Sequence, residues 1–125
     1  MRVAICIQSS EERYRISRLA DEIILPKGKI PKISLFPLPH ELLETTAAQA
    51  EKFDLALLSG HTDERLLQQL CSLLPVILIG EPELGLTAFE VGAAYFIESP
   101  ADSEKLEKAI THFMTRNTPP RRRYC

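Results

Sequence analysis

The amino-acid sequence predicts an α/β fold: a doubly wound, five-stranded parallel sheet in the order 2-1-3-4-5, with helices on both faces. Five short apolar segments alternate with five amphipathic segments along the 125 residues. Strands and helices that alternate in this way pair as a parallel sheet through right-handed crossovers. The run Leu55-Ala56-Leu57-Leu58 is also apolar without interruption, as expected for a central strand that helices cover on both faces.

The first part of the chain is expected to form a strand, a helix and a second strand. Apolar residues dominate Arg2–Ile7, which predicts the first strand. Ser9 is followed three residues later by Glu12, which has the form of a capping box, and the apolar residues that follow recur at helical spacing over Ser10–Ile24. A proline and a Lys-Gly-Lys turn end that helix, and Ile30–Leu35 supplies the second strand.

The middle of the chain repeats the alternation. A second helix is expected over Glu41–Lys52 and a third strand over Asp54–Ser59. Either Thr62 or Asp63 can cap a third helix. The apolar residues of that helix face inward, at Leu66, Leu67, Leu70 and Leu74. A fourth strand follows over Val76–Ile79.

The last part of the domain adds a short helix, a strand and a long helix. The short helix is expected around Thr87–Val91 and ends at Gly92, and Ala93–Ile97 forms the fifth strand. Asp102 opens the final helix, whose apolar pattern fades near residue 117. We therefore expect a single domain over residues 1–117.

Residues 118–125 are predicted to form a basic, proline-containing linker or tail. Thr118-Pro119-Pro120 is followed by three arginines, and prolines make such a segment semi-rigid. A tail of this kind is expected to lead to an effector domain that binds DNA. Alternatively, the arginines themselves contact phosphates, although three cations on a flexible tail bind only weakly and without sequence specificity.

The composition is that of a soluble domain. Hydrophobic residues make up 45% of the chain and charged residues 26%, which argues against disorder, and no apolar run approaches the roughly 20 residues of a membrane span. The N-terminus lacks the features of a secretory signal, so a cytoplasmic location is expected. The formal charge of −2 gives no reason to expect direct nucleic-acid binding by the domain itself.

The cysteines and histidines do not indicate a disulfide framework, a metal site or a catalytic site. Cys6, Cys71 and Cys125 are odd in number and widely spaced, so neither a disulfide framework nor a zinc site is expected. No nucleophile, base and orienting group can be placed together from the sequence. We therefore expect no metal, no cofactor, no catalytic residue and no enzymatic activity.

Three segments resemble the receiver domains of response regulators. They are MRVAIC at the start, FDLALLSG in the middle and AFEVGAAYFIESPADSEKLEKAI toward the end. The resemblance covers nearly the whole chain and implies the flavodoxin-like fold of the chemotaxis receiver CheY, within two-component signal transduction. The third segment is similar to the fourth helix, fifth strand and fifth helix of receivers that are attached to LytTR-type DNA-binding domains.

The resemblance also implies that the phosphorylation site is degenerate. Active receivers hold Mg²⁺ with two acidic residues after the first strand and accept phosphate on an aspartate at the end of the third. They also use a Ser or Thr after the fourth strand and a Lys before a proline after the fifth. In this chain those positions fall, in the same order, on Ile7 and Gln8, Ser59, Gly80 and Ser99. The chain therefore resembles a pseudo-receiver.

The chemistry of these side chains points the same way. Mg²⁺ prefers carboxylate and phosphate oxygens, which Ile7 and Gln8 do not offer, and Ser59 has only a weakly nucleophilic hydroxyl group. A shifted alignment would use Glu11 and Glu12 as the acidic pair and Asp54 as the acceptor. Asp54, however, begins its strand, roughly 15 Å from the edge where the site would lie, and the two glutamates are explained by the helix dipole.

A second group of residues is a candidate for interactions with other proteins. Phe89, Ala93, Tyr95 and Phe96 fall in the segment that receivers use for signalling contacts. Packing in the core is the alternative explanation for these apolar residues. If they are exposed, the surface formed by the fourth helix, fifth strand and fifth helix is expected to make a constitutive homodimer.

Two functions follow from the sequence. The first is a phosphorylation-independent regulatory domain, dimeric, that forms the N-terminal part of a transcriptional regulator or acts on a partner protein. The second is a small-molecule sensor with a pocket around Gln8, Ser59, Gly80 and Ser99, because open α/β sheets bind ligands at the carboxyl ends of their strands.

Overall fold

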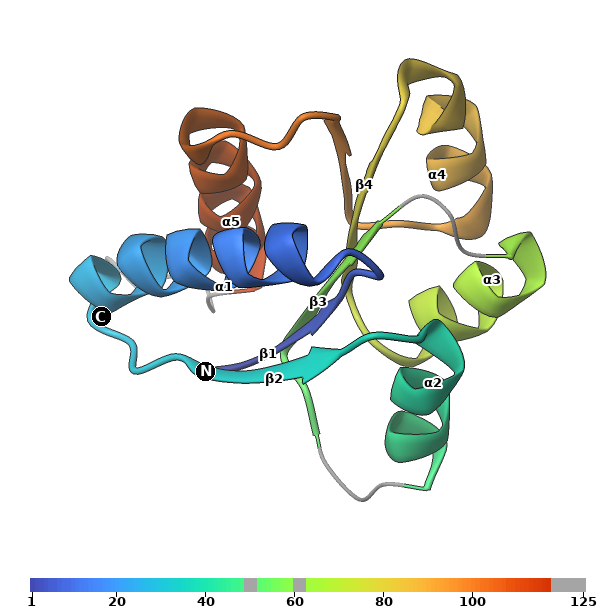
Figure 1. Ribbon diagram of the computed structural model, residues 1–125, viewed down its shortest axis with the longest axis horizontal. Coiled ribbons are helices and arrows are strands. Elements are labelled where there is room, and N and C mark those ends of the chain that lie inside the picture. The colour runs from blue at the N-terminus through green and yellow to red at the C-terminus, as the bar shows by residue number, and fades with distance from the viewer. Residues whose placement is uncertain (49–51, 60–62, 118–125) are drawn as a thin grey trace, which may run out of the picture.

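Five parallel strands form one sheet in the order β2-β1-β3-β4-β5, which confirms the predicted fold class and strand order. The structure is a computed structural model that describes residues 1–48, 52–59 and 63–117 (Figure 1). The strands are β1 (Arg2–Cys6), β2 (Lys32–Phe36), β3 (Leu55–Ser59), β4 (Val76–Gly80) and β5 (Tyr95–Glu98).

Helices cover both faces of the sheet. On one face lie α1 (Ser10–Ile24) and α5 (Ser103–Asn117), which contact each other, and on the other lie α2 (Pro39–Ala47), α3 (Glu64–Leu73) and α4 (Gly85–Val91) (Figure 1). Two short 3₁₀ turns, Leu25–Lys27 and Pro82–Leu84, follow α1 and precede α4. Among the described residues, no helix has the length and apolar character that a bilayer crossing needs.

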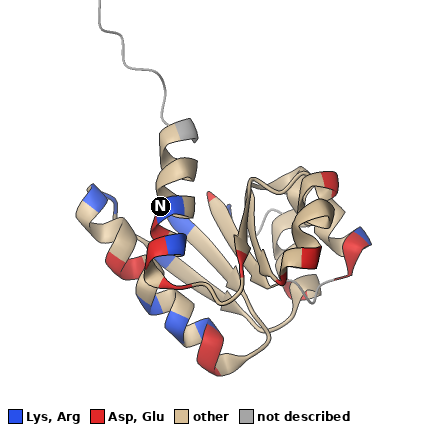
Figure 2. Ribbon diagram, turned by 90° about the horizontal axis from the view of Figure 1, so that it is seen from above, with Lys and Arg blue, Asp and Glu red and all other residues tan. Residues whose placement is uncertain are grey.

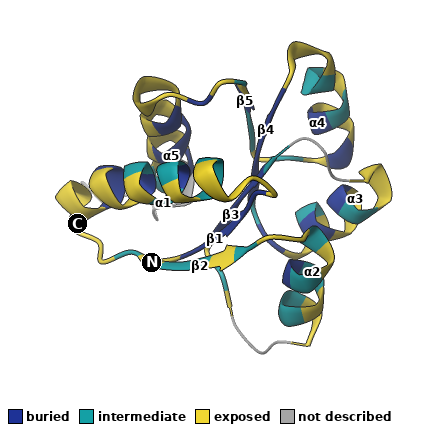
Figure 3. Cartoon of the chain, in the orientation of Figure 1, coloured by how far each residue is buried: buried dark blue, intermediate teal, exposed yellow. Residues whose placement is uncertain are grey.

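The sheet separates two apolar cores, because successive side chains of a strand point to opposite faces. The core on the α1/α5 side takes alternate strand residues, namely Val3, Ile5, Leu55, Leu57, Ile77, Ile79 and Ile97. The core on the other side takes the residues between them, Ala4, Cys6, Ala56, Leu58, Val76 and Leu78. Figure 3 shows these strands as the buried centre of the molecule. All the buried side chains in the described residues are apolar or cysteine.

The capping box predicted the start of α1. The Ser9 side chain accepts a hydrogen bond from the backbone N–H of Glu12, with a distance of 3.3 Å between Oγ and N. The helix then runs over Ser10–Ile24, as predicted, and buries Ile16, Ala20, Ile23 and Ile24. A cap of this kind stabilises a helix by about 1 kcal/mol, and the aliphatic stripe fixes which face of α1 lies on the sheet.

Several predicted bounds are wrong by a few residues. The second strand begins at Lys32 rather than Ile30, because the ladder with β1 starts at Arg2, and Ile30 is 75% exposed. The second helix runs over Pro39–Ala47 and not to residue 52, since its inward face is short and Ala47 is already exposed.

Further boundary differences lie around the last three helices. Asp63 is the N-cap residue of α3, although its side chain forms no capping hydrogen bond, and Thr62 lies outside the described residues. The fourth helix begins at Gly85, and the fifth strand begins at Tyr95 because its ladder with β4 starts there. The tail at 118–125 lies outside the described residues.

Candidate functional site

The carboxyl ends of the strands meet along one edge of the sheet, which we call the carboxyl rim. Ile7 and Gln8 follow β1, Ser59 ends β3, Gly80 ends β4, and Ser99 follows β5. The strand order places β1 and β3 side by side, with their connections leaving to opposite faces. This is the point at which open α/β sheets bind ligands.

The structure brings all five predicted positions into one cavity of about 430 Å³ at the carboxyl rim. Five further residues line the same cavity and were not singled out as site residues from the sequence: Ser9, Glu12, Ile79, Glu81 and Leu84. Of these, Glu12 was assigned from the sequence to the capping box and the helix dipole and not to the site. The signal that could have found it is the capping box, because a residue in the first turn of α1 must lie near the end of β1.

The five predicted positions differ in how open they are. Ile7 is buried and belongs to the α1/α5 core, so it forms part of the cavity's apolar floor. Gly80 is also buried, Ser59 and Ser99 are half-buried, and Gln8 is exposed. The side chains that this group contributes to the cavity are therefore one amide, two hydroxyls and one aliphatic group.

An arginine holds the loop between β1 and α1. Nη1 of Arg13 donates to the backbone carbonyl oxygen of Ile7 at 2.7 Å and to that of Gln8 at 3.2 Å. A hydrogen bond from a charged donor is stronger than one between neutral groups. This guanidinium group therefore stabilises the main chain at the position where the resemblance puts the acidic pair.

A lysine holds the loop between β5 and α5 in a similar way. Nζ of Lys105 lies 3.2 Å from the carbonyl oxygen of Glu98 and 3.4 Å from that of Pro100. The backbone N–H of Ser99 donates to the carbonyl oxygen of Gly80 at 2.8 Å, and the peptide bond between Ser99 and Pro100 is cis. These contacts fix Ser99 beside the end of β4.

The carboxylates of the cavity come from two different connections. Glu12 forms an ion pair with Arg15 on the same helix, and Glu81 is an exposed residue just after β4. In the part of the chain that the structure describes, no three His, Cys, Asp or Glu side chains lie close enough together to hold a metal ion. His61 lies outside the described residues.

Asp54, the acceptor of the shifted alignment, lies at the opposite end of the sheet. It immediately precedes β3, and its Oδ2 accepts a hydrogen bond from the backbone N–H of Arg2 at 2.8 Å. Its own N–H donates to the carbonyl oxygen of Arg2 at 2.8 Å. This carboxylate therefore joins β1 to β3 and is not at the carboxyl rim.

The predicted interaction residues do not share one environment. Phe89 on α4 is 83% exposed, whereas Ala93, Tyr95 and Phe96 are half-buried. The Tyr95 ring packs on His112 of α5, with 5.2 Å between the ring centres, and Phe96 packs against the core beneath α4. Of the four residues, only Phe89 presents most of its surface.

Leu86 was missed by the sequence analysis and is 70% exposed on α4. It lies one turn before Phe89, while Ala88 and Val91 of the same helix are buried. Their spacing of three residues places Leu86 and Phe89 on one face of the helix, and their exposure shows that it is the outer face. The two side chains define what we call the α4 patch.

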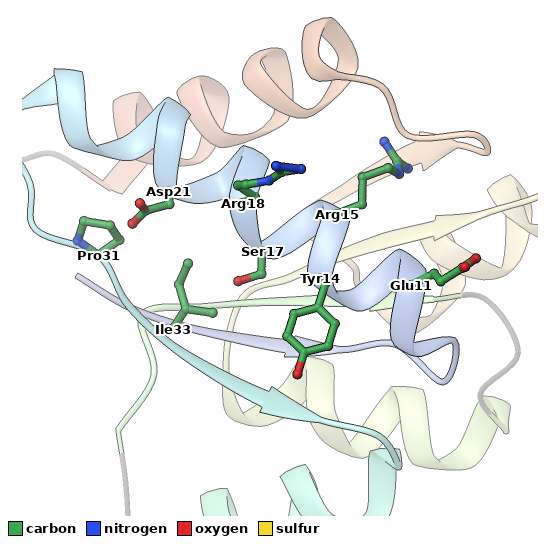
Figure 4. Close-up of a pocket in the computed structure, with 8 residues that line it drawn as sticks. All are labelled: Glu11, Tyr14, Arg15, Ser17, Arg18, Asp21, Pro31 and Ile33. Atoms are coloured by element: carbon green, nitrogen blue, oxygen red, sulfur yellow. The ribbon is translucent and has the colours of Figure 1, made fainter.

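A hollow larger than the rim cavity lies elsewhere, between α1 and the edge strand β2. It has a volume of about 760 Å³ and is lined by Glu11, Tyr14, Arg15, Ser17, Arg18, Asp21, Pro31 and Ile33. In Figure 4 six of these side chains spread along α1 and point in different directions, while Pro31 and Ile33 lie on the β2 segment. Because they do not converge on a common point, this groove is a weaker candidate site than the cavity at the rim.

Comparison with protein-family profiles and with curated proteins finds no match to this sequence. Solved structures, in contrast, match nearly the whole chain. The response regulatory domain of MrkE from Klebsiella pneumoniae has a TM-score of 0.76 at 18% identity, with 93% of this chain and 97% of that one covered.

Two other solved structures are similar. A LuxR family DNA-binding response regulator from Silicibacter pomeroyi has a TM-score of 0.71 at 23% identity, with 92% of this chain and 93% of that one covered. The non-phosphorylated HemR receiver domain from Leptospira biflexa has a TM-score of 0.70 at 16% identity, with 96% and 98% covered. At these identities the likeness concerns the fold, and the chain has the CheY-like fold of response-regulator receiver domains.

Proposed function

We propose that this chain is a pseudo-receiver: a regulatory domain that works through protein contacts and not through phosphorylation. The observation that carries the proposal is the content of the rim cavity. The positions that the resemblance assigns to phosphotransfer contribute an amide, two hydroxyls, a glycine and an isoleucine. None of these groups is a carboxylate or a cation.

The chemistry of phosphotransfer requires both kinds of charge. An acyl phosphate forms on a carboxylate nucleophile, and Mg²⁺ and a cationic side chain neutralise the transferring group. Ser59 offers a hydroxyl, and the nearby ammonium group of Lys105 donates to the carbonyl oxygens of Glu98 and Pro100. The lining in the described residues holds no cation to offset the carboxylates of Glu12 and Glu81, so an incoming phosphoryl group would be repelled. The cavity is therefore unsuited to phosphotransfer.

The proposed output is a homodimer that regulates a DNA-binding effector in the cytoplasm. The α4 patch supports the dimer, because two large apolar side chains lie exposed together on one turn and grouped apolar residues on a surface mark protein interaction sites. One structural relative is described as a LuxR family DNA-binding response regulator, and the sequence resemblance favours a LytTR-type effector. Either effector would be attached to the tail at 118–125 or act as a separate partner.

The test is light scattering on the purified chain, with and without Mg²⁺ and beryllofluoride, which mimics an aspartyl phosphate. We expect the mass of a dimer under both conditions, and the same midpoint of thermal unfolding. Phe89→Ser should convert the dimer to a monomer, whereas Tyr14→Ser, which removes an exposed aromatic ring from α1, should leave it intact. A mass or midpoint that changes with beryllofluoride contradicts the proposal.

A gain of function tests the assignment of the degenerate positions. The variant Gln8→Asp, Ser59→Asp, Ser99→Lys supplies a magnesium ligand, a phosphoacceptor and a cation at three of the five positions. We expect it to bind beryllofluoride in the presence of Mg²⁺, with the original chain as the control. A folded triple variant that remains indifferent to beryllofluoride would show that these residues do not occupy equivalent positions.

A second candidate function is supported by the cavity itself. Its volume of about 430 Å³ lies in the range of small-molecule sites, and it combines aliphatic residues with a few polar groups. In this alternative the domain senses a small molecule at the carboxyl rim, and ligand binding replaces phosphorylation as the input.

A further inference from the structure

The lining of the rim cavity carries negative charge and no positive charge within the described residues. Glu12 and Glu81 are its two ionisable side chains. The remaining polar groups are the hydroxyls of three serines and the amide of Gln8, and the apolar part consists of Ile7, Ile79 and Leu84. A small ligand would therefore meet an aliphatic surface beside two carboxylates.

The described cations nearest to the rim already have partners. Arg13 donates to the carbonyl oxygens of Ile7 and Gln8, Arg15 forms its ion pair with Glu12, and Lys105 donates to the loop after β5. In contrast, none of the described cations forms an ion pair with Glu81. Arg13 and Lys105 hold the loops in place and Arg15 neutralises Glu12, which leaves the carboxylate of Glu81 to face a ligand.

The starts of α1 and α5, two of the helices that begin at the rim, are capped and are therefore weak anion sites. A helix N-terminus attracts anions when its first N–H groups are unpaired. Here the Ser9 hydroxyl accepts from Glu12 N–H at the start of α1, and Oδ1 of Asp102 accepts from Lys105 N–H at 2.8 Å at the start of α5. Acidic residues surround both helix starts, at Glu11, Glu12 and Glu104. Figure 2 shows the charged residues on the helices and loops around a sheet that carries few of them.

We propose that the rim cavity binds a small organic cation, a primary ammonium or guanidinium group on a short aliphatic stem. The charged head lies at the carboxylate of Glu81, which forms no ion pair with a described residue, and the stem lies against Ile7, Ile79 and Leu84. The Ser99 hydroxyl and the Gln8 amide oxygen supply hydrogen-bond acceptors for the remaining N–H groups. This inference rests on the proposed absence of phosphotransfer at the same rim, and it names the class of molecule that the domain senses.

The test uses three probes of equal length that differ in the charge of the head group: n-pentylammonium, pentan-1-ol and pentanoate. Each is titrated into the ¹⁵N-labelled chain while amide shifts are followed by NMR. A ligand with so few atoms is expected to bind with a Kd on the order of 1 mM. We expect n-pentylammonium to shift the amide signals of Gln8, Ser59, Gly80 and Glu81. The Kd of pentan-1-ol should be at least threefold higher, and pentanoate should cause no shifts.

Two neighbouring carboxylates provide the matched variants. Glu81→Gln removes a charge from the lining and should weaken n-pentylammonium binding by about three- to tenfold, the effect of one ion pair at a partly exposed site. Glu83→Gln removes the same charge two residues away, outside the lining, and should change the Kd by less than about twofold. Nα-acetyl-lysine amide presents the same head and stem on a peptide, so its binding would extend the ligand class to a lysine side chain.

Several outcomes would overturn the inference. They are a stronger response to pentanoate or inorganic phosphate than to the amine, the same amide shifts with Mg²⁺ alone, equal weakening by both glutamine variants, or no rim shifts up to about 50 mM amine. A different result would contradict the proposed function: amide shifts at the rim when Mg²⁺ and beryllofluoride are added together. If no probe shifts any rim amide, the inferred ligand class is wrong, but the proposal of a pseudo-receiver is unaffected.

Discussion

The two ends of the sheet use their polar groups in different ways. At the amino-terminal end, the N-terminal ammonium group donates to the carbonyl oxygen of Ile30 at 3.0 Å, Lys32 N–H donates to Met1 O at 2.8 Å, and Asp54 bonds twice to Arg2. At the carboxyl rim, Gln8, Ser59, Ser99 and Glu81 border a cavity. The polar groups at the amino-terminal end therefore join strands, whereas these four at the carboxyl rim border a cavity.

The largest effect should come from the core that connects the two ends. Leu57 is fully buried in β3, and Leu57→Ala should lower the free energy of unfolding by about 3 kcal/mol, because it leaves a cavity that the sheet cannot close. Gln8→Ala at the rim should change it by less than about 0.5 kcal/mol. Urea denaturation of both variants measures this. A rim variant as destabilising as the core variant would contradict the distinction.

The second effect concerns Cys6, which ends β1 beneath the rim. Burial raises the pKa of its thiol to about 12, the Glu41 carboxylate adds to the rise, and Arg13 opposes it. The unfolded thiol ionises near its ordinary value while the folded one stays neutral, so this group's contribution is present below about pH 9 and is lost as the pH rises toward 12.

The measurement compares urea denaturation at pH 8 and pH 10. The original chain should lose about 1.4 kcal/mol more than Cys6→Ala over this interval, because one pH unit above the unfolded pKa corresponds to that amount. The same two chains at pH 6 and pH 8 serve as the control and should show no such difference. If the free energy of unfolding falls equally in both chains up to pH 10, the thiol is not buried as the structure shows.

A smaller effect is expected at the amino-terminal end. Asp54→Ala removes the acceptor for Arg2 N–H and should cost about 1 kcal/mol, a usual value for one hydrogen bond at the surface. Asp54→Asn keeps an acceptor oxygen and should recover at least half of that loss. Thermal unfolding of the two variants decides between them. Equal stability of Asp54→Ala and the original chain would mean that this bond does not hold the strands together.

The smallest effect is expected for Glu81→Gln. Glu81 is exposed and forms no ion pair with a described residue, so the free energy of unfolding should change by less than about 0.5 kcal/mol. Chemical denaturation checks this value. The variant would then separate binding from stability, and a larger loss of stability would assign Glu81 to the structural group of polar residues.

The sequence predicted the fold because strong local signals agreed with it. The capping box at Ser9 and the spacing of the isoleucines defined both ends of α1, and the apolar run in β3 identified a central strand. The bounds of β2 and α2 were missed because they depend on register and on contacts between distant segments. Arg2 pairs with Lys32, and nothing local in the sequence around Ile30 encodes that pairing.

The candidate site was only partly predictable. Alignment to receiver positions singled out five residues that line one cavity, but it could not find Glu81 or Leu84, which the turn after β4 places there. Of the two residues of the α4 patch, only Phe89 was predicted from the sequence. Gly85–Val91 holds too many apolar residues for spacing alone to separate the outer Leu86 and Phe89 from the inner Ala88 and Val91.

The division of the interior into two apolar layers affects how the chain can change over time. Strand residues facing α1 and α5 are separated by the backbone of the sheet from those facing α2, α3 and α4. Substitutions in one layer share few contacts with those in the other, so their energetic effects should add. Selection could therefore remodel the helix that bears Leu86 and Phe89 while the opposite layer continues to support the fold.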